Sequence, residues 1–166
     1  MGNKKAKTPE YAPRKIFEQI LKWSVIPTFD LVIEYGDQGF IVVKRKIAPY
    51  KNQWALLGLR MMKGERINDT LKRIAKNELS LNINPHRKIF LGQYVGKFKT
   101  EHQRQDLSTG YAIKARDTQL IKLNQDHFSD YLITKKIPSP IGAMYKFYLQ
   151  KYLRYPNSVY HSQKEI

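Results

Sequence analysis

The sequence predicts a mixed α/β (α+β) sandwich, because strand patterns stand before, between and after helix patterns. Residues 28–46 form two apolar segments around a GDQG turn, which is a hairpin pattern. Residues 67–79 instead repeat apolar side chains at helical spacing. The 166 residues suffice for one domain with its own core. We therefore expect a single domain over residues 10–155, between a basic tail at 1–9 and a C-terminal tail at 156–166.

The N-terminal part of the sequence predicts a helix followed by a hairpin. Within residues 10–24, Ile16, Ile20 and Leu21 recur at helical spacing, so we expect a short amphipathic helix. The segment TFDLVIEY predicts a strand, GDQG a tight turn, and FIVVKRK the antiparallel partner strand. Asp30 is unusual inside the first strand, because a buried carboxylate costs free energy unless it is paired.

A second helix and further strands complete the pattern. The apolar residues of 67–79 fall at positions 67, 71, 74, 75 and 79, which lie on one helical face. Strands are expected at KIFLGQYVGKF, GYAIKA and YLIT, and the polar segments KTEHQRQDLST and DTQLIKLNQDHFSD between them are expected as loops. A C-terminal helix should follow Pro138 and Pro140.

The composition points to an anionic partner. Lysine and arginine outnumber aspartate and glutamate by 30 to 14, which gives a formal net charge of +16. This charge attracts nucleic acid, acidic membranes or phosphorylated metabolites, and it does not choose among them. The basic residues are dispersed along the chain, and the aromatic strand signature of RNA-binding domains is absent. Nucleic acid is therefore the less favoured partner.

The absence of cysteine excludes disulfides and thiolate metal sites. A bound metal would therefore need oxygen or imidazole ligands. No apolar run approaches the ~20 residues of a membrane-spanning helix, and no apolar signal-peptide segment follows the basic N-terminus. We expect a soluble, cytoplasmic protein with no membrane partner.

The segment GLRMMKGERINDTLKRIAKNELSL, residues 58–81, resembles an altered Nudix box. That signature is a glycine, five residues, a glutamate, seven residues, then arginine, glutamate, an aliphatic residue, any residue, two glutamates, any residue, glycine and an aliphatic residue. The positions that match it are Glu65, Arg73, Glu78 and Leu81. The positions that replace its glycines and two of its glutamates are Leu59, Ile74, Asn77 and Ser80. The resemblance implies a Nudix-type α/β/α sandwich with a mixed sheet.

The missing glutamates affect the expected chemistry. The standard box uses several carboxylates on one helical face to gather divalent metal at a pyrophosphate, and Glu78 alone does not hold such a cluster. The GDP-mannose mannosyl hydrolase branch lacks the same two glutamates. The sequence resembles that branch along FEQILKWSVIPTFDLVIEY, VVKRKIAPYKNQW and RIAKNELSLNI. In that branch, water displaces GDP at the anomeric carbon of the sugar.

The resemblance assigns a metal site and a base. The backbone carbonyl of Gly58 and the carboxylate of Glu78 match ligands of one Mg²⁺, with Mn²⁺ as an alternative metal. A third ligand falls on Asp126, or on Gln125 if the loop register shifts by one. His127 matches the histidine that activates the water. The branch also implies a homodimer.

The resemblance assigns five further residues to the substrate, a nucleotide sugar or another nucleoside diphosphate compound. Arg60 and Arg45 match contacts to the diphosphate, and Asp30 matches a carboxylate that contacts the sugar. Arg73 falls on the box arginine, which pairs with the box glutamate or faces the phosphates. Arg60 and Arg73 would join His127 in catalysis by helping the leaving group depart. Tyr111 falls on a tyrosine that approaches a phosphate.

Two other functions stay open. A pyrophosphohydrolase would use Glu65, Glu78 and Asp126 to cleave the diphosphate itself. A catalytically inactive Nudix-like domain would bind a nucleotide or nucleic acid, which the missing glutamates and the net charge of +16 favour. Without the resemblance, Glu78 would be a surface acid near a helix end and His127 a solvated loop histidine.

Overall fold

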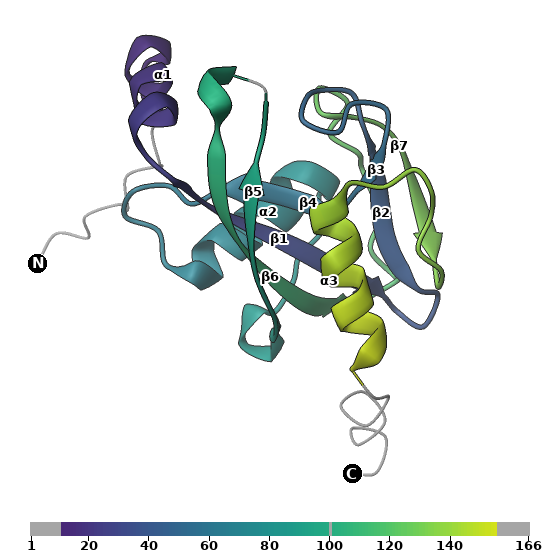
Figure 1. Ribbon diagram of the computed structural model, residues 1–166. Helices are drawn as coiled ribbons and strands as arrows, with labels where there is room; N and C mark the ends of the chain where they lie inside the picture. The colour runs from purple at the N-terminus through teal and green to yellow at the C-terminus, as the bar shows by residue number, and fades with distance from the viewer. Residues whose placement is uncertain (1–10, 100, 156–166) are drawn as a thin grey trace, which may run out of the picture.

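The computed structural model describes residues 11–99 and 101–155, so the predicted tails lie outside the described residues. The described part has helices around one mixed sheet (Figure 1). The element bounds, in chain order, are α1 Arg14–Trp23, β1 Ile26–Tyr35, β2 Phe40–Arg45, β3 Trp54–Ala55, β4 Leu57–Arg60, α2 Ile67–Leu79, η1 Pro85–Arg87, β5 Ile89–Lys97, η2 Glu101–Gln103, β6 Gln105–Ala115, β7 Phe128–Thr134 and α3 Ala143–Arg154. The predicted mixed α/β class is confirmed.

The sheet opens between its first two strands. Its order is β3-β2-β1-β6-β5, with β6 parallel to β1, while β4 also pairs with β1 and β7 with β2. β1 and β2 pair only beside their turn, at Ile33↔Ile41 and Glu34↔Phe40. Farther along, β4 takes the place of β2 beside β1, and β3 takes the place of β1 beside β2. The segment 54–60 therefore separates the two strands like a wedge.

Helices cover both faces of the sheet. In Figure 1, α3 crosses in front of the sheet and α2 lies behind it. Tyr152 of α3 donates a hydrogen bond to Glu34 of β1 at 2.9 Å. The apolar stripe predicted for α2 is buried, and Leu71 and Ile74 have no exposed surface. None of the described helices has both the length and the apolar character needed to cross a bilayer.

Two predicted boundaries were wrong, and both errors came from polar residues in strands. β6 begins at Gln105 and not at Gly110, because Asp106 and Ser108 face inward and find polar partners there. β7 begins at Phe128 and not at Tyr131, because the Phe128 side chain is buried. Neighbouring residues of a strand point to opposite faces, so a polar residue can stand next to a buried one without ending the strand.

Candidate active site

A cleft of about 270 Å³ lies where β1 and β2 diverge. It gathers residues from distant parts of the chain. The segment 54–60 lies between β1 and β2, and it brings three elements close to the loop that precedes β7: the start of β1, the strand β4 and the end of α2. Seven of the residues predicted for the site line it, namely Asp30, Arg45, Gly58, Arg60, Arg73, Glu78 and His127. Tyr111 and Asp126 are not part of its lining.

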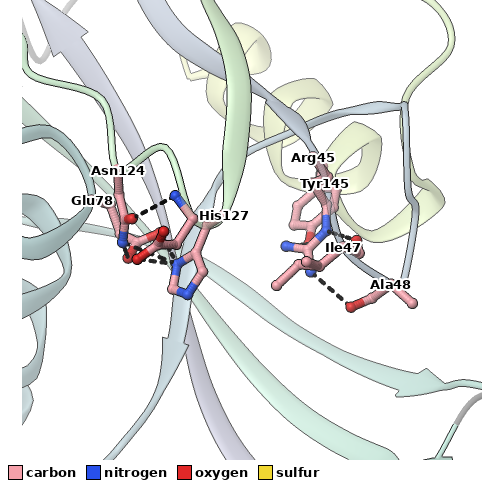
Figure 2. Close-up of polar contacts among 8 residues, drawn as sticks. Arg45, Ile47, Ala48, Glu78, Asn124, His127 and Tyr145 are labelled. Atoms are coloured by element: carbon pink, nitrogen blue, oxygen red, sulfur yellow. Dashed lines mark hydrogen bonds and ion pairs between the residues drawn. The ribbon is translucent and has the colours of Figure 1, made fainter.

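Glu78 and His127 form the polar centre of the cleft. Glu78 is on the inner face of α2 near its C-terminal end, and 1% of its surface is exposed. His127 Nδ1 lies 2.9 and 3.0 Å from the two carboxylate oxygens, and Asn124 Nδ2 donates to Oε1 at 3.2 Å (Figure 2). The hydrogen bond with Glu78 raises the pKa of His127, although partial burial of the ring opposes this.

The contact with Glu78 assigns different roles to the two nitrogens of His127. Against an ionised carboxylate, which only accepts hydrogen bonds, Nδ1 is the donor and carries the proton. In the neutral ring, Nε2 is then the nitrogen with a free lone pair. A carboxylate that fixes a histidine in this tautomer is the arrangement that serves general-base catalysis in hydrolases.

The loop before β7 places Asn124, not its neighbours, beside Glu78. The Asn124 backbone N–H donates to the carbonyl of Glu78 at 2.9 Å, so the loop is joined to the end of α2. Asp126 is exposed, and its backbone N–H donates to Asn124 Oδ1. Gln125 is also exposed, and its carbonyl accepts from Lys46. Sequence reasoning missed Asn124, although asparagine commonly folds a turn in this way.

Arg73 pairs with Glu65 inside the loop-helix segment. Arg73 Nη2 lies 2.9 Å from Glu65 Oε2 and donates to the Arg60 carbonyl at 2.8 Å. Glu65 also accepts from the Met62 backbone N–H at 2.9 Å and from the Thr70 hydroxyl at 2.8 Å. The pair therefore fixes the turn between β4 and α2. Two roles were expected for Arg73, pairing with the box glutamate or facing the phosphates. Its contacts are those of pairing with the glutamate.

Glu65→Gln should destabilise the protein by about 2 to 4 kcal/mol at neutral pH, because it leaves Arg73 with no carboxylate. Burial alone would raise the pKa of Glu65, but the bonds from Arg73, Met62 and Thr70 outweigh it and lower the pKa below 4.5. The stabilisation is therefore complete above about pH 4.5 and is lost as the pH falls through the folded-state pKa. Urea unfolding at neutral and acidic pH measures this, and a pH-independent difference between the proteins would contradict it.

Two cleft arginines are held by neighbouring groups. The Arg60 guanidinium lies 3.7 Å from the Phe17 ring centroid and 5.3 Å from that of Tyr11, and burial lowers its pKa. Arg45 donates to three carbonyls of residues 47–49, with Nε to the Pro49 oxygen at 2.6 Å. Figure 2 shows Arg45 beside Tyr145 and Ala48, away from the His127 cluster.

The Asp30 side chain fits beside Gly58 because glycine has no side chain. It pairs in register with Gly58 of β4, where an added Cβ atom would lie 2.2 Å from Asp30 Oδ1. Ser108 donates a hydrogen bond to Oδ2, and the Ser108 hydroxyl in turn accepts from Tyr148 of α3 at 2.9 Å. Burial raises the pKa of Asp30 to about 7, although the Ser108 hydrogen bond opposes this. The sugar-contacting carboxylate expected from the resemblance is therefore a buried group beside the cleft.

Tyr111 lies away from this centre. Its ring stacks on Phe29 with centroids 6.2 Å apart and meets the edge of Phe90 at 5.8 Å. Lys88 Nζ lies 5.9 Å from the same ring. These contacts place Tyr111 in an aromatic cluster, and its predicted approach to a phosphate remains a prediction.

Solved structures show which fold this is. A MutT Nudix hydrolase from Burkholderia pseudomallei is 16% identical and has a TM-score of 0.67, with 77% of this chain and 98% of that chain covered. The chain has the Nudix fold. The Nudix domain of NrtR from Shewanella oneidensis, complexed with ADP ribose, is 14% identical with a TM-score of 0.62, covering 85% of this chain and 91% of that chain.

A third similar structure is longer than this chain. It is a bifunctional NMN adenylyltransferase/ADP ribose pyrophosphatase from Francisella tularensis, complexed with AMP and a manganese ion. It is 17% identical with a TM-score of 0.53, and the match covers 83% of this chain and 40% of that chain. No family model matches the sequence, and no curated protein matches it.

The donors near Glu78 suit one hard cation and not a cluster. Within residues 11–99 and 101–155, no three histidine, aspartate or glutamate side chains come together as a metal site. Glu78 supplies one buried carboxylate, and Gly58 lines the same cleft. Mg²⁺ commonly binds proteins through one or two carboxylates and fills its other positions with water and substrate phosphate. The residues present fit that use.

Proposed function

We propose that this chain is a metal-assisted hydrolase of a nucleoside diphosphate sugar, and that water attacks the anomeric carbon. The observation that carries the proposal is the pairing of His127 Nδ1 with the buried carboxylate of Glu78, at the wall of a cleft lined by arginines. Inside an otherwise altered box, this pair provides a base without requiring a cluster of carboxylates.

His127 would act on the water through Nε2. Glu78 holds the proton on Nδ1, so Nε2 accepts the proton that the attacking water loses. The positive charge that develops on the ring is stabilised by the same carboxylate. Asn124 donates to Glu78 and keeps the carboxylate oriented while the ring changes charge.

The other cleft residues would hold the substrate. Arg45 and Arg60 provide positive charge for the diphosphate, whose negative charge increases as the bond to the sugar breaks. Asp30 offers a carboxyl group to a sugar hydroxyl. Gly58, Glu78 and a residue of the loop at 124–126 would hold Mg²⁺ or Mn²⁺. When bound, the metal neutralises charge on the leaving diphosphate.

The proposed substrate class fits the arginines of the cleft and is supported by the ligands of the structural neighbours. The NrtR domain is complexed with ADP ribose, and the bifunctional protein is an ADP ribose pyrophosphatase complexed with AMP. A nucleoside diphosphate sugar contains both the diphosphate that arginines bind and a carbon that water attacks. Within this class, the sequence resemblance makes GDP-mannose the first compound to test.

Hydrolysis in water enriched with oxygen-18 tests the reaction. Nucleotide sugars are incubated with the protein and magnesium, and the products are identified by mass spectrometry. We expect the label in the released sugar and none in the nucleoside diphosphate. Label in a phosphate product would overturn the proposal in favour of pyrophosphate hydrolysis. Release of no product from any nucleotide sugar or nucleoside diphosphate compound would favour a binding domain without catalysis.

A further inference from the structure

Buried polar side chains gather on the side of the sheet that α3 covers. They are Thr28 and Asp30 of β1 and Asp106 and Ser108 of β6, which we call the polar array. Thr28 pairs in register with Ser108, and residues two apart on a strand point to the same side. The Ser108 hydroxyl accepts a hydrogen bond from Tyr148 of α3, so the array lies on the α3 side. A sheet face beneath a helix is usually apolar, which makes this array unusual.

Thr28 is the member of the polar array that has no hydrogen-bond partner. Asp30 accepts from Ser108, and Asp106 Oδ1 accepts from Arg104 Nε at 2.7 Å. Among residues 11–99 and 101–155, the Thr28 hydroxyl is the only buried side-chain nitrogen or oxygen atom left unpaired. An unpaired buried hydroxyl costs free energy, and valine would suit the same strand position without that cost. The fold itself therefore does not need the hydroxyl of Thr28.

The polar array borders the candidate active site. The lining of the cleft includes three of its members, namely Thr28, Asp30 and Asp106. Phe98 and Tyr145 line the same cleft, and the Tyr50 ring meets both of them edge-on, at centroid distances of 5.9 and 5.3 Å. Sites for small organic molecules combine such aromatic walls with a few polar groups that fix the orientation of the ligand. The cleft thus has both parts of such a site.

The spacing of the array suits several groups of one molecule better than one ion. Thr28 and Asp30 leave β1 ~7 Å apart, and neighbouring strands lie ~5 Å apart. Oxygen ligands of one Mg²⁺ or Ca²⁺ instead converge within ~2.6 Å of the ion. In the part of the chain that the structure describes, no three histidine, aspartate or glutamate side chains form a metal site. A six-membered sugar ring carries hydroxyl groups around its edge and has an apolar face for aromatic rings.

We propose that Thr28 and Asp106 bind hydroxyl groups of the sugar and decide which sugars the cleft accepts. The inference rests on the proposed function and adds two residues to the contact suggested for Asp30. The Thr28 hydroxyl exchanges a hydrogen bond with one sugar hydroxyl, and the Asp106 carboxylate accepts from another. Arg104 stays paired with Asp106 and holds that carboxylate in place. A sugar without the matching hydroxyl leaves a buried group unpaired and is therefore rejected.

Monodeoxy sugars test the Thr28 contact. Each compound lacks one hydroxyl of the nucleotide sugar that the oxygen-18 experiment identifies, beginning with GDP-mannose. For the parent chain, we expect one deoxy compound to have a kcat/KM about 3- to 12-fold lower, the value of a hydrogen bond between neutral groups. Thr28→Val should lower kcat/KM for the full sugar by the same factor and leave that deoxy compound unaffected. An equal loss on every sugar would overturn the contact.

Asp106→Asn should give the same pattern on a different deoxy compound. The expected loss on the full sugar is larger, about 10- to 100-fold, because a hydrogen bond to a charged group is stronger. The compound that lacks the hydroxyl bound by Asp106 should lose much less. If Asp106→Asn lowered kcat/KM for all the sugars alike, Asp106 would have no part in choosing the sugar.

Unfolding in urea without substrate separates binding from a structural role. Thr28→Val removes only an unpaired hydroxyl, so its midpoint should equal or exceed that of the parent chain. The matched control is Thr70→Val, because Thr70 is also buried but donates to Glu65 at 2.8 Å. This control should lower the midpoint and keep the parent's discrimination between sugars. Thr28→Ser retains a hydroxyl and should restore most of the activity. A lower midpoint for Thr28→Val would overturn the proposal.

Titration calorimetry separates failure of this subsite from failure of the proposed function. Binding of the nucleotide sugar is compared with binding of the nucleoside diphosphate, without added metal so that hydrolysis is suppressed. Thr28→Val should weaken binding of the nucleotide sugar about 3- to 12-fold and leave that of the nucleoside diphosphate unchanged. This result together with oxygen-18 in a phosphate product would reject the proposed reaction and retain the subsite. Equal effects on both ligands, or no binding of any nucleotide sugar, would overturn the subsite.

Discussion

Glu78→Gln is expected to lower kcat by a factor of about 10² to 10⁴, the range in which a correctly protonated general base contributes. Glutamine has nearly the shape of glutamate, but it can present its NH₂ group to His127 Nδ1. Nδ1 then becomes the acceptor, and the neutral ring carries its proton on Nε2, where the water must be bound. The variant retains the contact, but it loses the base and also removes the carboxylate that is proposed to hold the metal. His127→Ala should lower kcat by a similar factor.

The controls for this pair separate catalysis from folding. Thermal unfolding should show both variants folded, and the double variant should lose little more activity than either single variant, because the two residues act as one unit. Asp126→Asn, in the same loop, separately tests the proposed third metal ligand. If Glu78→Gln and His127→Ala changed only stability, the proposed base would be wrong and a nucleotide-binding domain would be favoured.

Asp30→Asn is expected to stabilise the protein by about 2 to 3 kcal/mol more at pH 8 than at pH 5, while it lowers activity. Burial raises the pKa of Asp30 from 3.8 to about 7, so the folded state binds this proton more tightly than the unfolded state. Stability from Asp30 is therefore complete below about pH 3.8 and is lost as the pH rises through about 7. Asparagine keeps an acceptor for Ser108 and carries no charge at any of these values.

Denaturant unfolding of both proteins at several pH values checks this expectation. The quantity to compare is the difference in unfolding free energy between Asp30→Asn and the parent chain. That difference should increase with pH between about pH 4 and pH 7 by up to about 1.4 kcal/mol per unit. A difference in unfolding free energy that does not change with pH would show that Asp30 ionises in the folded protein with little loss of stability. An unchanged kcat/KM would remove it from the substrate site.

The fold could be predicted from the sequence because its main elements repeat apolar residues with clear periods. In the hairpin at 28–46 and in helix α2, the apolar residues that form the sequence pattern are also the residues that pack into the core. The start of β6 could not be predicted, because the inward side chains there are Asp106 and Ser108. Their burial depends on Arg104, Asp30 and Tyr148, and sequence patterns do not show such contacts between distant residues.

The candidate site could be predicted in part for a similar reason. The spacing within residues 58–81 predicted that Glu78 and Arg73 would share a helix, and the structure adds that Arg73 faces Glu65. The loop at 124–127 follows no period, so its register could not be fixed. An asparagine folds that loop through its own side chain, and this places Asn124 beside Glu78.

The burial of Ile74 has a consequence for rebuilding the site. In the standard Nudix box this position is a glutamate, but here its side chain is fully enclosed in the core. A glutamate introduced at this position would bring an unpaired charge among apolar neighbours. Asn77, by contrast, is exposed and could be replaced by glutamate with little disturbance. Introducing the two missing glutamates would therefore require the core around position 74 to be redesigned as well.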